Sequence, residues 1–418
     1  MADKMYLCID LKSFFASVEC VERGLDPFTT NLAVADPARN SGTICLAITP
    51  AMKELGIKNR CRVFEIPSHI KYIKARPRIS LYMKYSADIY GTYLNYISKE
   101  DIYIYSIDEC FIDITSYLKI YHKTPKELAI MLMDAVFKKT GICATAGIGT
   151  NLFLAKVALD ITAKHVPDHI GYLDEEEFKK QIWHHKPMTD IWSIGKGVAT
   201  RLNHLGLYDL YDVSQCDPRR LYKEFGVNAE FLIDHSKGIE PCTIKEIKEY
   251  KSKSNSISNG QILFEDYKYE DAKVVLTEMV ELLTLEMNEK DLSADGISLM
   301  VGYSKDCIPA TGGSRKISRT NSYSTILKSV LELYEKSTDK HHPIRKLNVG
   351  LNNLLPETFI QYGLFDNPEL NIKEKKVQNI LMSIKNKYGK NAILRGISFE
   401  EKATGRERNK MVGGHNSE

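Results

Sequence analysis

The chain has 418 residues, of which 43% are hydrophobic, so it can form more than one buried core. At about 150 residues per domain, this length predicts roughly three domains. Its 57 Lys and Arg residues nearly balance 54 Asp and Glu residues, and the net charge of +3 does not by itself indicate a nucleic-acid-binding protein.

The sequence contains none of the usual signals for secretion, membrane insertion or structural cysteine chemistry. Its nine cysteines are scattered singly and form no C-x-x-C pair, so neither a zinc site nor a disulfide framework is predicted. No apolar run approaches the roughly 18 residues of a membrane span, and no long apolar segment follows the N-terminus. We therefore expect a reduced, cytoplasmic protein.

Alternating strands and helices are predicted from the N-terminus to about residue 180, which is typical of an α+β catalytic domain. Strands are expected at residues 5–10, 32–36, 43–48, 102–107, 110–114 and 143–148, and helices at residues 81–98, 125–139 and 151–164. A further helix is expected after Ser13, which could cap it, with Gly24 available to end it.

From residue 181 the pattern changes to short helices. Gly195 and Gly197 lie between two of them and resemble a helix-hairpin-helix, whose backbone amides would face a DNA phosphate. An ordinary helix–loop–helix with glycine caps explains the pattern equally well. Residues 245–258 read as a polar linker. Beyond it we expect a helix at 271–288, a strand at 296–303, a basic segment at 315–321, a further segment at 325–335 and a strand at 344–351.

Three carboxylates stand at the ends of strand-like apolar runs. Asp10 ends the first run, and Asp108 and Glu109 follow the run at residues 102–107. Mg²⁺ prefers carboxylate and phosphate oxygens, and a pair of such ions can stabilise both reacting oxygens of a phosphoryl transfer. Adjacent strand residues face opposite sides, so Asp108 and Glu109 can converge only at a turn. Alternatively, each carboxylate could be an ordinary solvated turn or strand-end residue.

Two segments then resemble a known family. Residues 10–16 (Asp-Leu-Lys-Ser-Phe-Phe-Ala) and 106–109 (Ser-Ile-Asp-Glu) resemble the active-site motifs of Y-family (translesion) DNA polymerases, most closely a UmuC-like branch of Gram-positive type. The resemblance implies an α+β right-hand polymerase with palm, small fingers, helix-hairpin-helix thumb and a C-terminal little-finger domain. The implied boundaries are 1–10 and 77–180 for the palm, 11–76 for the fingers, 181–244 for the thumb, 245–258 for the linker, 259–356 for the little finger, and 357–418 for a tail.

The resemblance implies a DNA-directed DNA polymerase that performs error-prone translesion synthesis by two-metal nucleotidyl transfer. Asp10, Asp108, Glu109 and the Leu11 carbonyl would hold two Mg²⁺ ions. The implied partners are primer-template DNA, deoxynucleoside triphosphates and a sliding clamp, with no membrane, for a monomeric catalytic subunit. Two alternatives are a non-catalytic DNA- or clamp-binding protein derived from the same fold and a palm-type nucleotidyl cyclase.

The resemblance also assigns a nucleotide-binding helix start. The amides of Ser13, Phe14 and Phe15 would face the triphosphate. Phe15 aligns with the steric gate that rejects a ribose hydroxyl, although an aromatic residue at helical spacing is more often a core residue. Phe14 beside it could fill that core position.

Two lysines are assigned to the triphosphate by the same resemblance. Pro50 and Lys53 stand where the family often has the Tyr and Arg of a Tyr-x-x-Arg motif, and Lys offers a point charge without the bidentate fork of Arg. Lys164 takes the place of the palm lysine that contacts the β- and γ-phosphates. The alternative for Lys53 is an exposed helix lysine. Lys156, Asp160 and Lys164, at i, i+4 and i+8, could equally form a surface salt-bridge stripe.

Contacts to DNA and to the clamp complete the predicted sites. The DNA-binding candidates are Gly195, Gly197, Arg315, Lys316 and Arg319. The pentapeptide from Gln361 to Phe365 resembles the motif by which bacterial polymerases dock on the sliding clamp. Leu364 and Phe365 would fill an apolar pocket and Gln361 would make polar contacts at its edge, an arrangement that concentrates affinity in few side chains. A five-residue match can also arise by chance.

Overall fold

The computed structural model describes residues 4–37, 39–251, 255–359 and 368–417. The chain divides into two compact units, each described here by itself. Unit 1 comprises Met1–Lys251 with Asn416–Glu418, and unit 2 comprises Ser252–His415. No helix in these described ranges is long and apolar enough to cross a membrane.

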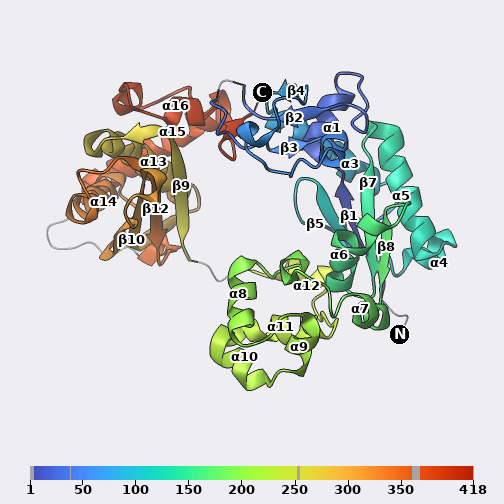
Figure 1. Ribbon diagram of the computed structural model, residues 1–418. Coiled ribbons are helices and arrows are strands. Elements are labelled where there is room, and N and C mark those ends of the chain that lie inside the picture. Colours follow the sequence, from blue (N-terminus) through green and yellow to red (C-terminus); the bar gives the residue numbers. More distant parts are fainter. Residues whose placement is uncertain (1–3, 38, 252–254, 360–367, 418) are drawn as a thin grey trace. The chain divides into compact units, whose positions relative to one another are not determined.

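A five-stranded sheet organises unit 1, in the order β5-β6-β1-β7-β8 (Figure 1). Its strands are β1 (Tyr6–Leu11), β5 (Ile102–Ile104), β6 (Glu109–Asp113), β7 (Ala144–Gly149) and β8 (Ile170–Leu173). The helices packed on it are α1 (Phe14–Val21), α3 (Ile79–Tyr93), α5 (Pro125–Thr140) and α6 (Leu152–Asp160). Strand β1 is central and antiparallel to both of its neighbours.

Side chains of β1 alternate between two cores because successive strand residues face opposite sides of the sheet. Leu7, Ile9 and Leu11 pack with α1, α3 and α5, whereas Tyr6 and Cys8 pack with α6. Helix α6 lies directly on β7. The approach is so close that a Cβ added at Gly147 would come within 2.1 Å of the α6 backbone. This close approach brings the polar side chains of α6 toward the ends of β1 and β6.

Smaller elements complete unit 1. A three-stranded sheet of order β3-β2-β4 lies in the region predicted as fingers, with β2 (Leu32–Val34), β3 (Ala47–Ile48), β4 (Ile73–Ala75), α2 (Pro50–Glu54) and the 3₁₀ turn η1 (Val63–Glu65). The region predicted as thumb is helical, with α8 (Lys196–His204), α9 (Leu210–Gln215), α10 (Pro218–Phe225) and α11 (Ala229–Ser236).

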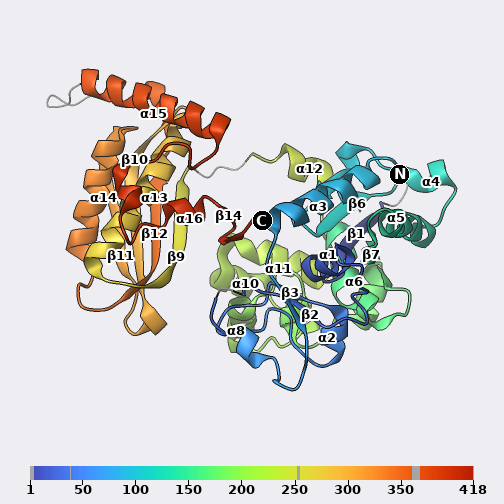
Figure 2. The same ribbon diagram turned by 90° about the horizontal axis from the view of Figure 1, so that it is seen from above.

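Unit 2 is a sheet covered by helices. Its strand order is β11-β10-β12-β9, and β13 also pairs with β10. The strands are β9 (Ile257–Tyr267), β10 (Leu292–Tyr303), β11 (Thr311–Thr320), β12 (Ile344–Asn352) and β13 (Leu355–Pro356), and the helices are α13 (Tyr269–Glu289) and α14 (Tyr323–Ser337). Both helices pack against the sheet in one apolar core (Figure 2).

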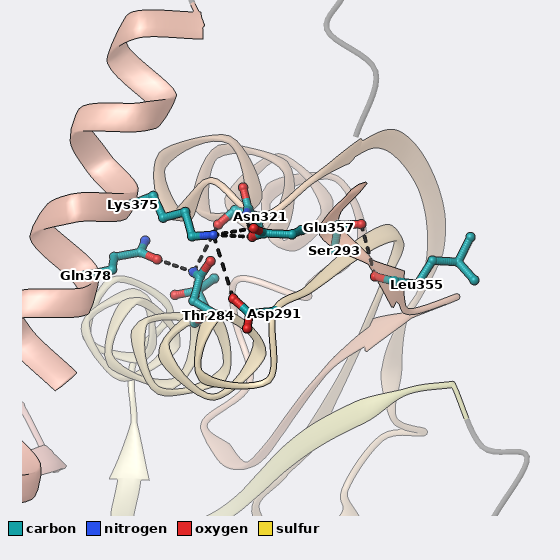
Figure 3. A network of polar contacts seen from close by, with 9 residues as sticks. Thr284, Asp291, Ser293, Asn321, Leu355, Glu357, Lys375 and Gln378 are labelled. Carbon is teal, nitrogen blue, oxygen red and sulfur yellow. Dashed lines mark hydrogen bonds and ion pairs between the residues drawn. The ribbon is translucent and has the colours of Figure 1, made fainter. Parts of the chain in front are cut away.

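The segment read from the sequence as a tail is folded over most of its length. It contains α15 (Pro368–Tyr388), η8 (Gly396–Phe399) and α16 (Gly405–Arg408), and both α15 and η8 pack on α13. Polar anchors hold α15 in place (Figure 3): Lys375 pairs with Glu357, and buried Gln378 bonds to Asn288. Because these contacts are polar, the spacing of apolar residues in the sequence did not predict that α15 packs on α13.

Other elements differ from their predicted bounds. Residues 245–249, expected in the linker, belong to α12 (Ile244–Glu249), which a reciprocal capping box between Thr243 and Glu246 begins and the burial of Ile244 stabilises. The strand predicted at 43–48 is reduced to β3, and the helix predicted at 151–164 ends as α6 at Asp160.

Candidate active site

The three predicted carboxylates lie at neighbouring ends of β1 and β6. Asp10 is directly opposite Glu109 in the antiparallel register, and directly opposite residues project from the same face of a sheet. The Leu11 amide donates to the Asp108 carbonyl at 2.9 Å, which holds Asp108 beside the end of β1. Two short stretches of sequence therefore place three carboxyl groups around one strand end.

Asp108 and Glu109 lie where a turn joins β5 to β6. The amides of Tyr105 and Ser106 both donate to the Glu109 carbonyl at 3.0 Å. The Ser106 hydroxyl donates to Asp108 Oδ1 at 2.6 Å. Asp108 is thus part of the turn, while Glu109 begins the strand. Because the two residues do not both belong to a continuous strand, their side chains need not face opposite sides of the sheet.

Negative charge concentrates at Asp10. Burial, followed by the charges of Asp108 and Glu109, raises the pKa of Asp10 to about 7. Lys156 opposes this shift and Asp160 adds to it. Burial and neighbouring negative charge disfavour the ionised form of this carboxyl group. A cation that binds beside it would stabilise the ionised form.

The Glu109 carboxylate is held by side chains on the α6 side of the sheet. Lys156 Nζ lies 2.8 Å from Oε1 and 2.9 Å from Oε2 of Glu109. The Cys8 thiol donates to Oε1 at 3.1 Å. Lys156 also pairs with Asp160 at 3.1 Å, one helical turn away. Lys156 therefore balances part of the negative charge of the carboxylates. From the sequence, Lys156 was expected only as a possible member of a surface salt-bridge stripe.

The donor set suits a divalent cation by chemistry but is not assembled around one point. Three carboxylates supply the hard oxygen ligands that Mg²⁺ prefers, and the crowding of negative charge at Asp10 favours a cation. Among the described residues, however, no group of three or more His, Cys, Asp and Glu side chains is arranged to hold a metal ion. The Glu109 oxygens contact Lys156 and Cys8 instead.

Three lysines are coupled electrostatically to one another or to Asp10. Lys53 lies in α2 and Lys164 in the 3₁₀ turn η3 (Thr162–His165). Lys53 is exposed, but partial desolvation lowers the pKa of its ammonium group; the charge of Asp10 opposes this shift and that of Lys164 reinforces it. Burial also lowers the pKa of Lys12, and Lys53 contributes to that shift. The shared electrostatic influence places these residues in one neighbourhood.

These lysines suit a polyphosphate. No carboxylate in the described part of the chain forms an ion pair with Lys12, Lys53 or Lys164. Uncompensated ammonium groups whose charges repel one another gain from an anionic ligand, and Lys is a common phosphate binder. Sequence reasoning identified Lys53 and Lys164 but missed Lys12, although it follows Asp10 by two positions.

The start of α1 differs from its predicted form. Ser13 precedes the helix in the left-handed conformation, with φ 48° and ψ 42°, and its side chain makes no capping hydrogen bond, so the predicted capping by this hydroxyl is wrong. Ser13 Oγ is buried and has no hydrogen-bond partner among the described residues. Phe14 is only 2% exposed, so its side chain belongs to the core.

Phe15 lies partly buried against a rigid support. Its ring stacks on Tyr82 with centroids 4.4 Å apart and planes at 17°. The Tyr82 hydroxyl donates to buried Glu19 at 2.8 Å, and Arg78 donates two hydrogen bonds to the same carboxylate. Tyr82 was not among the predicted residues, because its contact with Phe15 joins α1 to α3 and leaves no local sequence signal.

The predicted DNA-binding glycines lie at the start of α8. Gly195 is its N-cap residue, with φ −78°, and Gly197 is in its first turn. A Cβ at either position would meet nothing within 4 Å. Neither glycine is therefore required by packing or by a positive φ.

The three predicted basic residues of β11 have different surroundings. The Arg319 side chain is only 14% exposed, pairs with Asp295 at 2.7 Å and donates to two backbone carbonyls, so it supports the fold. Arg315 is exposed but pairs with Glu332 at 2.7 Å. Lys316 is exposed on the same strand. Of the three, Lys316 and Arg315 are accessible to a partner.

The predicted clamp-binding residues Gln361, Leu364 and Phe365 lie outside the described residues. The flanking elements are η7 (Glu357–Phe359) and α15. Both belong to unit 2, and the ion pair between Glu357 and Lys375 joins them (Figure 3). In the sequence, the pentapeptide therefore lies between two elements of unit 2.

Comparisons with known proteins match most of the chain. Residues 9–160 match the impB/mucB/samB family, and residues 254–364 match the C-terminal domain of the same family. UvrX of Bacillus subtilis (strain 168), named as a UV-damage repair protein, is 31% identical over 99% of this chain and 98% of its own length. DNA polymerase IV 2 of Halalkalibacterium halodurans is 30% identical over 99% of both chains.

A solved structure has a similar fold. A Y-family DNA polymerase chimera matches 85% of this chain and 100% of its own, with a TM-score of 0.64. Its sequence identity to this chain is 21%, so this likeness concerns the fold alone.

Proposed function

Because this chain belongs to the impB/mucB/samB family and has the fold of a Y-family polymerase, we propose that it is a DNA-directed DNA polymerase that performs error-prone translesion synthesis in DNA repair and damage tolerance. Relatives named DNA polymerase IV, matched over nearly their whole length, support this activity. The observation that carries the proposal is a cluster of three carboxylates accompanied by lysines that form no ion pair with any described residue. That arrangement suits chemistry on a triphosphate.

In the proposed site, Asp10, Asp108, Glu109 and the Leu11 carbonyl hold two Mg²⁺ ions. When bound, such a pair supplies the charge that stabilises the attacking and leaving oxygens of phosphoryl transfer. The chain itself places the carboxylates, through the register of β1 with β6 and the turn at Ser106. For Glu109 to contribute, its carboxylate must turn from the contacts it makes with Lys156 and Cys8.

The lysines and the start of α1 bind the incoming nucleotide. Lys53, Lys164 and Lys12 contact the triphosphate, and the amides of residues 13–15 face it where the helix dipole is positive. The Ser13 hydroxyl, which has no hydrogen-bond partner in the described part of the chain, is available to the same ligand. Phe15, held by Tyr82, forms the wall that excludes a ribose 2′-hydroxyl. Most of the catalysis then comes from positioning and electrostatics.

DNA contacts lie on two regions. The amides around Gly195 and Gly197, at the start of α8, bind a backbone phosphate. Arg315 and Lys316 of β11 contact DNA in unit 2, while Arg319 keeps the strand in place through Asp295. The pentapeptide from Gln361 to Phe365 docks on a sliding clamp, and the polymerase acts as a monomeric catalytic subunit.

Primer extension tests the activity directly. The full chain is incubated with a primed DNA oligonucleotide, the four deoxynucleoside triphosphates and Mg²⁺, and products are resolved by length. We expect template-directed addition with Mg²⁺ and none with EDTA. DNA binding without extension at any divalent cation concentration would favour a non-catalytic protein derived from the same fold. A cyclic nucleotide product formed without DNA would indicate a cyclase.

A further inference from the structure

Two cysteines lie opposite each other in the region of the small sheet. Ile44 and Arg62 form an antiparallel bridge, flanked by a hydrogen bond from the Cys45 amide to the Cys61 carbonyl at 2.8 Å. One step from the bridge, this register puts Cys45 directly opposite Cys61. The two side chains therefore project from the same face of the pair.

This placement suits a disulfide. Residues opposite each other in an antiparallel pair have Cα atoms about 4.5–5.5 Å apart, and disulfides span about 4.4–6.8 Å between Cα atoms. Each thiol also influences the pKa of the other, in agreement with their facing positions. The separation expected for this register therefore falls within the range that a disulfide spans.

The two thiols also occupy a large share of a small core. The buried residues of this core, within the described part of the chain, are Ala33, Ala35, Cys45, Ile48, Met52, Ile57, Cys61 and Ile66. A core of this size contributes little stability by apolar burial, and small cores gain most from a covalent cross-link.

We propose that Cys45 and Cys61 form a reversible intramolecular disulfide when the protein is exposed to a peroxide. Cys61 sulfur attacks one peroxide oxygen, the O–O bond breaks, and a sulfenic acid and water form. Cys45 sulfur then attacks Cys61 sulfur, the S–O bond breaks, and a second water leaves with the Cys45 proton. The two thiols lose two electrons, the peroxide gains them, and a dithiol reductant reverses the change. This modification is independent of the proposed polymerase activity.

The environment assigns the order of the two steps. Cys61 is 7% exposed and Cys45 is fully buried, so a peroxide reaches Cys61 first. Burial raises the pKa of Cys61, and the neighbouring Cys45 thiol opposes part of this rise. Burial and the charge of Cys61 raise the pKa of Cys45 to about 12. The disulfide would close a loop of residues 46–60, which contains α2 and Lys53.

Peptide mapping of the full chain tests the proposal. Hydrogen peroxide is added until exposed Cys307 is oxidised, free thiols are alkylated under denaturing conditions, and the protein is digested with trypsin. We expect residues 40–53 joined to residues 61–62, lighter than the two separate peptides by two hydrogen atoms. Dithiothreitol should abolish the joined peptide, and amide exchange of residues 46–60 should be slower in the oxidised protein.

The controls distinguish this pair from general oxidation. Cys20→Ser removes another buried cysteine and should leave the joined peptide unchanged, whereas Cys61→Ser should abolish it. The measurement on the unsubstituted chain does not depend on how any variant folds. Recovery of Cys45 and Cys61 unlinked, at a dose that oxidises Cys307, would overturn the proposal. Linkage of either residue mainly to a different cysteine would overturn it as well.

Discussion

Replacing Asp10 by Asn should stabilise unit 1 when no divalent cation is present. The pKa of Asp10 is raised from 3.8 to about 7 in the folded chain, so the folded state holds the proton more tightly than the unfolded state does. The contribution of Asp10 to stability therefore becomes less favourable as the pH rises from about 4 to about 7, and its full penalty is present above pH 7. Asn has nearly the same shape and carries no charge.

The size of the effect follows from the same shift. At about 1.4 kcal/mol per pKa unit, the difference between 3.8 and about 7 sets an upper bound of about 4 kcal/mol. We expect Asp10→Asn to remain stabilising even if Asp108 and Glu109 move after the charge of Asp10 is removed. At pH 4 the carboxyl group is largely protonated in the wild-type fold, so the advantage of the variant should nearly vanish there.

Urea unfolding followed by tryptophan fluorescence measures this difference, because Trp183 and Trp192 both lie in unit 1. We expect the variant to unfold at higher urea than wild type at pH 8 in EDTA. Adding Mg²⁺ should narrow the gap, since a ligand that binds only the folded wild-type site stabilises it. Asp113→Asn, outside the cluster, is the matched control. Equal or lower stability of Asp10→Asn at pH 8 would refute the electrostatic account.

Three further outcomes are expected. Phe15→Ala should raise ribonucleotide over deoxyribonucleotide incorporation by about 10–100-fold, measured by single-nucleotide kinetics; an unchanged ratio would return Phe15 to a core role. Leu364→Ala with Phe365→Ala removes two apolar anchors, each worth roughly 1.5–3 kcal/mol if buried, so clamp-dependent synthesis should collapse while synthesis without clamp is retained. Lys375→Ala should lower the stability of unit 2 by about 1 kcal/mol, with Lys376→Ala as the exposed control in denaturant titrations.

Much of unit 1 was predictable, because local sequence signals agree with the tertiary structure there. The apolar run ending at Asp10 forms β1, and the helix predicted at 125–139 forms α5, which ends at Gly141 with φ 70°. The turn that carries Asp108 was also expected, since two adjacent carboxylates after an apolar run are poorly suited to a continuous buried strand.

The remainder depends on contacts between distant segments. Lys156 meets Glu109 only because Gly147 and Gly149 let α6 approach β7 closely. Tyr82 supports Phe15 through the packing of α3 on α1. The docking of α15 rests on polar pairs whose partners lie far away along the chain, and a local pattern of apolar residues cannot reveal them.

The most direct test of the proposed catalytic centre compares Asp108→Ala with Asp113→Ala. Asp113 ends β6, the strand that follows the turn carrying Asp108, and accepts a hydrogen bond from the Thr115 amide at 3.0 Å, so it controls for loss of a nearby carboxylate outside the cluster. Single-turnover incorporation and primer-template affinity are measured for both variants. We predict that Asp108→Ala loses at least about 100-fold in rate with nearly unchanged DNA affinity, while Asp113→Ala retains extension. Wild-type incorporation by Asp108→Ala would contradict the proposed site.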